Sequence, residues 1–171
     1  MNRIKLSENF FVDEFCPKEI HDLIEKGEAK LSDFQDSRIP LLAQWIRTEV
    51  KKSVNINNWI DGGNLDERGV RMPNTSTGAK RSRHKYEVNA DGKIIRKSDA
   101  LDIQIGTMTG KQMYDWAYEN KEQLFELGVR TIEHYTLTPN WLHMDLHSRT
   151  NAKNTITIVT LNGVAATWAV D

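Results

Sequence analysis

The stretch Trp141-Leu-His-Met-Asp-Leu-His147 decides how the rest of the chain is interpreted. Alternate residues of a strand project to the same side, so His143, Asp145 and His147 are expected on one face and the apolar residues between them on the other. This polar row has two interpretations. It is either a set of metal-binding side chains or the solvent-facing side of an ordinary amphipathic strand.

A second predicted strand carries another candidate ligand. In Ala-Leu-Asp-Ile-Gln-Ile, residues 100–105, apolar side chains alternate with Asp102 and Gln104. This period of two predicts a strand with an apolar core face and Asp102 on the opposite face. His84 follows residues 61–83, which show no periodicity and are rich in Gly, Asn, Thr and Arg. We expect a long surface loop there, and such loops are usually functional.

The remaining pattern places helices mainly in the first half of the chain and strands towards its end. We expect helices over about 17–27, 39–50 and 109–128, and strands over 54–57, 100–105, 129–135 and 141–147. Two hairpins are expected, at about 87–97 with an Asp91-Gly92 turn and at about 155–170 with an Asn162-Gly163 turn. The predicted class is α+β, with N-terminal helices packed on a mainly antiparallel sheet, in one domain spanning 1–171.

Composition excludes several classes of protein. The 171 residues are 39% hydrophobic and 27% charged, with a net charge of −1. A protein that coats nucleic acid or an anionic membrane needs a basic excess, so neither partner is expected, although the basic run at 80–85 keeps a weak nucleic-acid alternative. No signal-peptide pattern is present, and no apolar run reaches the ~20 residues of a membrane span. We expect synthesis in a cytoplasm and a monomer.

Two histidines and a carboxylate suit a catalytic zinc ion, because three protein ligands leave the fourth tetrahedral position for water. Taken singly, Asp102 also fits a strand-edge carboxylate and His84 a surface histidine in a basic loop. A facial-triad iron site is excluded, since no further histidine follows His147.

Three segments together resemble a known family. They are Ser82-Arg-His84-Lys-Tyr, Ser98-Asp-Ala-Leu-Asp102-Ile and Trp141-Leu-His143-Met-Asp145. The set is similar to the motifs of the D-alanyl-D-alanine metallopeptidases, the superfamily that includes the Hedgehog signalling domain and many phage endolysins. The resemblance extends over most of the chain to about residue 147, including a Gly69-Val-Arg71 turn.

The resemblance implies a Hedgehog-like fold and Zn²⁺ held by His84, Asp102 and His143. It also implies hydrolysis of peptide bonds in bacterial peptidoglycan, as a carboxypeptidase or an endopeptidase, at the cell wall and from a phage gene. Two departures stand out. Seventeen residues separate His84 from Asp102, more than in the family, and the predicted hairpin at 87–97 accounts for the excess; Ser98 replaces a usual glycine.

The motifs leave the identity of the general base open, because Asn140 occupies the position where many members of the family have Glu. Glu133 on the preceding strand is the best substitute, although it also fits an exposed strand carboxylate. His134 and His147 are weaker candidates.

Other residues are assigned supporting roles. Arg71 is expected to bind a substrate carboxylate or the oxyanion. Asp145 is expected to orient a ligand histidine, and Ser82 is expected to form a hydrogen bond near the site. The competing hypothesis is a non-catalytic zinc-binding structural or binding domain, such as a phage particle component.

Overall fold

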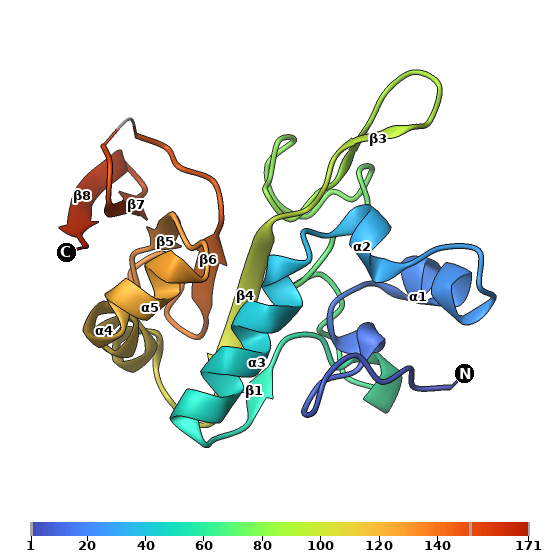
Figure 1. The fold of residues 1–171 in the computed structure, drawn as a ribbon, viewed down its shortest axis with the longest axis horizontal. Coiled ribbons are helices and arrows are strands. Elements are labelled where there is room, and N and C mark those ends of the chain that lie inside the picture. Colours follow the sequence, from blue (N-terminus) through green and yellow to red (C-terminus); the bar gives the residue numbers. More distant parts are fainter. Residues whose placement is uncertain (1, 151, 171) are drawn as a thin grey trace.

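The computed structural model describes residues 2–150 and 152–170 and combines helices with a six-stranded mixed sheet (Figure 1). The sheet order is β1-β4-β6-β5-β7-β8. Its strands are β1 (Val54–Asn55), β4 (Ala100–Ile105), β5 (Thr131–Glu133), β6 (Leu142–Asp145), β7 (Thr155–Thr160) and β8 (Gly163–Ala169). The helices are α1 (Lys18–Glu25), α2 (Leu31–Phe34), α3 (Arg38–Val50), α4 (Gly110–Glu119) and α5 (Lys121–Glu126), with 3₁₀ turns η1 (Val12–Glu14) and η2 (Trp59–Asp61).

Neighbouring strands of the sheet are antiparallel except for β5 and β7, which run parallel. The prediction of a fold that combines helices with a mainly antiparallel sheet is therefore confirmed at the level of class. The parallel pair arises because the chain crosses from β6 to the far side of β5 before entering β7, instead of returning beside β6.

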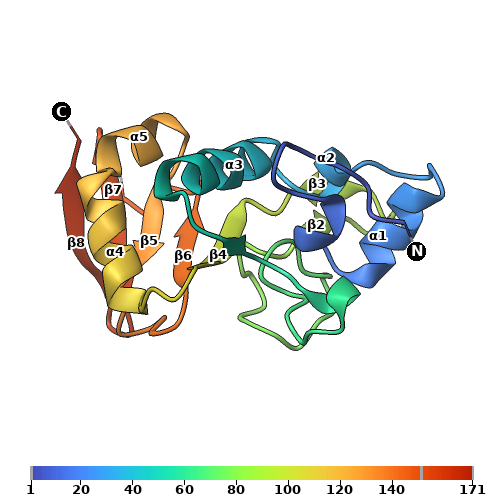
Figure 2. The same cartoon turned by 90° about the horizontal axis from the view of Figure 1, so that it is seen from below.

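Helices pack along one face of the sheet. α3 lies against β1 and β4, α4 against β6 and α5 against β7. In β4 the alternation is as predicted, because Leu101, Ile103 and Ile105 are fully buried. Figure 2 shows α3 on one side of β4 and the loop that follows η2 on the other. The polar face of β4 is thus turned towards this loop, which contains no helix or named strand between 62 and 86.

Several predicted boundaries were wrong. The helix expected over 109–128 is two helices, because Asn120 leaves helical geometry (φ −112°, ψ 21°) and donates its side-chain amide to Trp116 O at 2.8 Å. The strand expected to reach residue 135 ends at Glu133, since Leu137 N–H donates to His134 O and begins a turn. Helix α2 and both 3₁₀ turns were not predicted.

At 87–97 and 155–170 the structure has antiparallel strand pairs. In the first, β2 (Glu87–Val88) pairs with β3 (Ile94–Arg96), and Gly92 at the turn adopts φ +77°, which glycine tolerates best. The second is the β7–β8 pair, with Gly163 at the start of β8. Among the described residues, the helices are too short and too polar to span a bilayer.

Candidate metal centre

Three segments that are far apart in the chain bring His84, Asp102 and His143 together. Asp102 lies on β4 and His143 on β6, where the two residues are directly opposite partners. His84 enters from the loop on the polar side of the sheet. His84 Nε2 lies 3.1 Å from His143 Nδ1 and 3.2 Å from Asp102 Oδ1, and His143 Nδ1 lies 2.6 Å from the same oxygen. The exposed fractions of His84, Asp102 and His143 are 2%, 5% and 6%, so all three residues are buried.

The spacing of these three atoms fits a small divalent ion. Ligands bound at about 2.0–2.1 Å in a tetrahedron lie about 3.3 Å from one another. The three donor atoms are 2.6–3.2 Å apart, close to that value. They belong to two imidazoles and a carboxylate, which are common ligands of transition metals and zinc. The group can therefore hold a metal ion after small adjustments.

The His84 ring is fixed by the backbone of the loop. Its Nδ1 lies 2.7 Å from Gly69 O, and the proton on Nδ1 leaves Nε2 free to bind an ion. A Cβ at Gly69 would lie 2.1 Å from Phe15 O, so only glycine allows this close approach of the two backbones. Ser82 supports the same turn, because its Oγ accepts from the His84 amide at 3.3 Å.

Asp102 is fixed by an arginine on its other oxygen. Arg71 Nη2 donates to Asp102 Oδ2 at 3.0 Å, and Arg71 Nε donates to Glu67 O. Burial alone would raise the pKa of Asp102. The attraction of His84 and His143 and their hydrogen bonds outweigh it, so the pKa of this carboxyl lies well below its usual value. These contacts favour the ionised carboxylate, which is the form that binds a metal ion.

His143 presents Nδ1 to the other two ligands and Nε2 towards Asp145. Burial disfavours its charged form, but the charge and hydrogen bond of Asp102, with contributions from Asp145 and Glu133, raise the pKa of His143 to about 10. Asp145 is fully buried, with Oδ2 3.7 Å from His143 Nε2. That separation is an electrostatic contact and is too long for a hydrogen bond.

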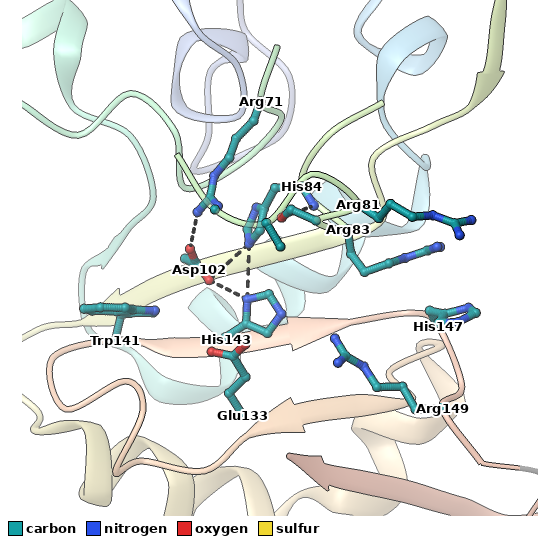
Figure 3. Close-up of a pocket in the computed structure, with 13 residues that line it drawn as sticks. Arg71, Arg81, Arg83, His84, Asp102, Glu133, Trp141, His143, His147 and Arg149 are labelled. Atoms are coloured by element: carbon teal, nitrogen blue, oxygen red, sulfur yellow. Dashed lines mark hydrogen bonds and ion pairs between the residues drawn. The ribbon is translucent and has the colours of Figure 1, made fainter. Parts of the chain in front are cut away.

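The metal-binding group opens into a cavity of about 660 Å³. Glu133, at the end of β5, lines this cavity, and Figure 3 shows its carboxylate beside the His143 ring. Arg71, Ser82 and His147 also line it. The structure thus brings the predicted ligands, the predicted base and the predicted arginine to one place.

One predicted candidate, His134, lies elsewhere. His134 is not among the cavity residues; its ring packs against Tyr135 and Tyr114, and its Nδ1 is 2.8 Å from Thr136 Oγ1. Asn140 is exposed in the turn before β6 and does not line the cavity.

Sequence reasoning missed three further arginines in the cavity wall, Arg81, Arg83 and Arg149. They come from two loops on either side of the sheet strands that carry Asp102 and His143. Arg81 and Arg83 belong to the basic run at 80–85, but no sequence pattern joins this run to Arg149, so only the tertiary structure reveals that the three converge.

No known protein family, curated protein or solved structure shows a significant match to this chain.

Proposed function

We propose that this protein is a zinc-dependent peptidase that hydrolyses stem peptides of bacterial peptidoglycan. One observation carries the proposal: a buried group of two histidines and an aspartate, contributed by three separate segments, opens into a cavity that is also lined by the carboxylate of Glu133. Structural zinc sites are usually closed by four protein ligands, whereas catalytic sites keep one position open. Three convergent ligands facing a cavity match the second kind.

The residues around the group suit hydrolysis. A zinc ion, when bound, supplies a coordinated water with a pKa of about 7 and polarises the scissile carbonyl. Glu133 accepts the proton of the attacking water and returns it to the leaving amine, as a general base and then a general acid.

Arg71 is assigned two tasks in this proposal. Its Nε and one Nη2 N–H are engaged by Glu67 O and Asp102, which holds the guanidinium in place. Three N–H groups of an arginine with five donors then remain for the developing oxyanion. The arginine that steadies the ligand carboxylate thereby also stabilises the transition state.

The choice of substrate depends on the sequence motifs. The segments that supply the three ligands are those that resemble the D-alanyl-D-alanine metallopeptidases, and the structure joins them at one centre. Peptides of the bacterial cell wall are therefore the substrates to assay first. The masses of the products identify the bond that is cleaved.

The test compares Glu133→Gln with the wild type and with Glu126→Gln, which makes the same change at an exposed carboxylate on α5. Each protein is loaded with zinc, its metal content is measured, and peptidoglycan digests are analysed by mass spectrometry. Loss of a general base lowers the rate by about 100-fold or more. We expect Glu133→Gln to keep its zinc and lose at least that factor, with Glu126→Gln unchanged.

A non-catalytic zinc-binding domain is the second candidate, and Asn140 favours it, because the position usual for the general base carries an amide. A wild-type protein that binds one zinc ion per chain yet cleaves no peptidoglycan peptide would establish this candidate and exclude the peptidase. Full activity of Glu133→Gln would instead refute the role of this residue and leave the peptidase standing.

A further inference from the structure

The two ends of the cavity differ in chemistry. Figure 3 shows the Trp141 indole at one end, beyond Asp102, and Arg81, Arg83 and His147 towards the other. Arg149 reaches into the cavity from below this second end. We call Arg81, Arg83 and Arg149 the arginine end. Any extended ligand that crosses the metal-binding group therefore meets an aromatic wall on one side and cations on the other.

Two of the three arginines are held by acidic partners that also orient them. Arg83 donates from Nε to Asp99 Oδ1 at 2.7 Å and pairs through Nη2 with Asp99 Oδ2. Arg149 donates from Nη2 to the buried Asp145 at 3.2 Å. Each guanidinium has five N–H donors, so both retain donors for a ligand.

Arg81 differs from the other two. It is exposed, and no ion pair or hydrogen bond of its side chain is found among the described residues. Asp99 and Asp145 offset two of the three positive charges. The pKa of Glu87 is lowered by its hydrogen bond to Arg96 and, to a smaller extent, by the charge of Arg81. Glu87 forms its ion pair with Arg96, so a surplus of positive charge remains at this end. A site with fixed guanidinium groups and a surplus positive charge is suited to a carboxylate, which arginine binds through two parallel N–H···O bonds.

We propose that the arginine end is a specificity subsite that binds a carboxylate of the peptide substrate, on the side of the scissile bond away from Trp141. This inference rests on the proposed peptidase function and adds a substrate class, peptides that carry a negative charge close to the cleaved bond. The carboxylate belongs either to an acidic side chain or to the C-terminus of the peptide.

The test measures binding to the zinc-loaded Glu133→Gln protein, so that the ligand is not consumed. Three short peptides of one length are titrated by calorimetry: one with only a C-terminal carboxylate, one amidated with an acidic side chain, and one amidated and neutral. A hydrogen-bonded arginine–carboxylate contact is worth about tenfold in affinity. We expect the neutral peptide to bind about tenfold more weakly than the better acidic peptide, which identifies the source of the carboxylate.

The same titrations are repeated after Arg81→Glu and, as a matched control, Lys80→Glu. Lys80 is the adjacent exposed cation and does not line this cavity. Arg81→Glu should remove the preference for the acidic peptide, while Lys80→Glu should change it by less than about twofold, as expected for an exposed charge. Arg149→Gln, which removes a second cation of the subsite, should reduce the preference independently.

Three results overturn the subsite: equal binding of acidic and neutral peptides, an unchanged preference in Arg81→Glu, or an equal loss in Lys80→Glu, which would indicate only the general field of the protein. Failure of the peptidase is a separate outcome. A wild type that cleaves nothing but keeps the Arg81-dependent preference refutes hydrolysis and retains the anion subsite. Cleavage without any acidic preference refutes the subsite and retains hydrolysis.

Discussion

Among the residues that the structure describes, two groups of side chains are close enough to share a metal ion, and they differ in how they are built. His84, Asp102 and His143 come from a loop and two neighbouring strands and are all buried. His21, Asp22 and Glu25 come from a single helix, α1, and their ligand atoms also lie within 4.8 Å of one another. Proximity alone therefore does not distinguish the two groups.

Their surroundings do distinguish them. In the first group two ligands are held by hydrogen bonds, His84 to Gly69 O and Asp102 to Arg71, and His143 has an electrostatic contact with Asp145. In the second group the carboxylates have local partners, because Lys18 Nζ lies 2.6 Å from Asp22 and the Asn2 amide donates to Glu25 at 2.8 Å. A metal ion there would have to displace these partners from two carboxylates that are partly or fully exposed, although His21 itself is buried. We expect only the first group to hold zinc tightly.

The largest effect is expected from His143→Ala. Loss of even a supporting residue lowers metal affinity by about 10–100-fold, so loss of a ligand should exceed about 100-fold. Metal analysis after dialysis should give close to one zinc ion per wild-type chain and almost none for the variant.

The paired variant is His21→Phe, which keeps a ring against Trp59, where the two rings now meet edge to face at 5.7 Å. It should leave the zinc content unchanged. If His21→Phe loses zinc as His143→Ala does, the two groups are equivalent and the argument from burial and support is wrong.

The sequence predicted the strands and ligands of the first group because they follow local rules. The period-two pattern of 100–105 and 141–147 places Asp102 and His143 on polar faces, and the motif resemblance joined them to His84. The sequence could not predict that Arg71 binds Asp102, or that His143 presents Nδ1 and not Nε2. These details depend on the register of β4 with β6 and on the path of an irregular loop, which tertiary packing determines.

Local competition explains the boundaries that were missed. The pattern of apolar residues continues through Asn120, so it predicts one helix over 109–128. The side chain of Asn120 instead bonds a backbone carbonyl and separates α4 from α5. Periodicity reports which residues are buried, and a single polar side chain at the surface can still end a helix.

A smaller effect on zinc is expected from Gly69→Ala. The added Cβ would meet Phe15 O at 2.1 Å, so the loop must shift and move the carbonyl that orients His84. We expect a loss of about 1–3 kcal/mol in the free energy of unfolding, as for other overpacked sites. Zinc affinity should fall by about 10–100-fold, as for other supporting contacts. Urea titration and competition with a chromophoric chelator measure the two quantities.

Gly27→Ala is the matched control, because Gly27 lies just after α1, the helix that carries the second group. Gly27 follows α1 with φ +75°, and nothing lies within 4 Å of the position of an added Cβ. Left-handed backbone geometry costs about 1–2 kcal/mol for alanine, so this variant should lose stability without losing zinc affinity. Equal loss of zinc in both variants would mean that affinity follows global stability and that the Gly69 contact has no specific role.

The smallest effect expected is the release of a single proton when zinc binds. Because the pKa of His143 is raised to about 10, both ring nitrogens of His143 are protonated at neutral pH in the metal-free protein, and the ring is positively charged. The proton on Nδ1 must leave when an ion binds there. Asp102, whose pKa is lowered, is already ionised and releases none.

One released proton makes the apparent affinity rise about tenfold for each pH unit below the pKa of His143. Calorimetry near pH 6, where a zinc-bound water with a pKa of about 7 keeps its proton, in two buffers of different ionisation enthalpy, should give close to one proton per zinc. The His21→Phe variant should give the same number, since the second group takes no part. Binding that releases no proton would show that His143 is neutral in the metal-free protein. Asp102 would then bind the metal ion without raising the pKa of His143.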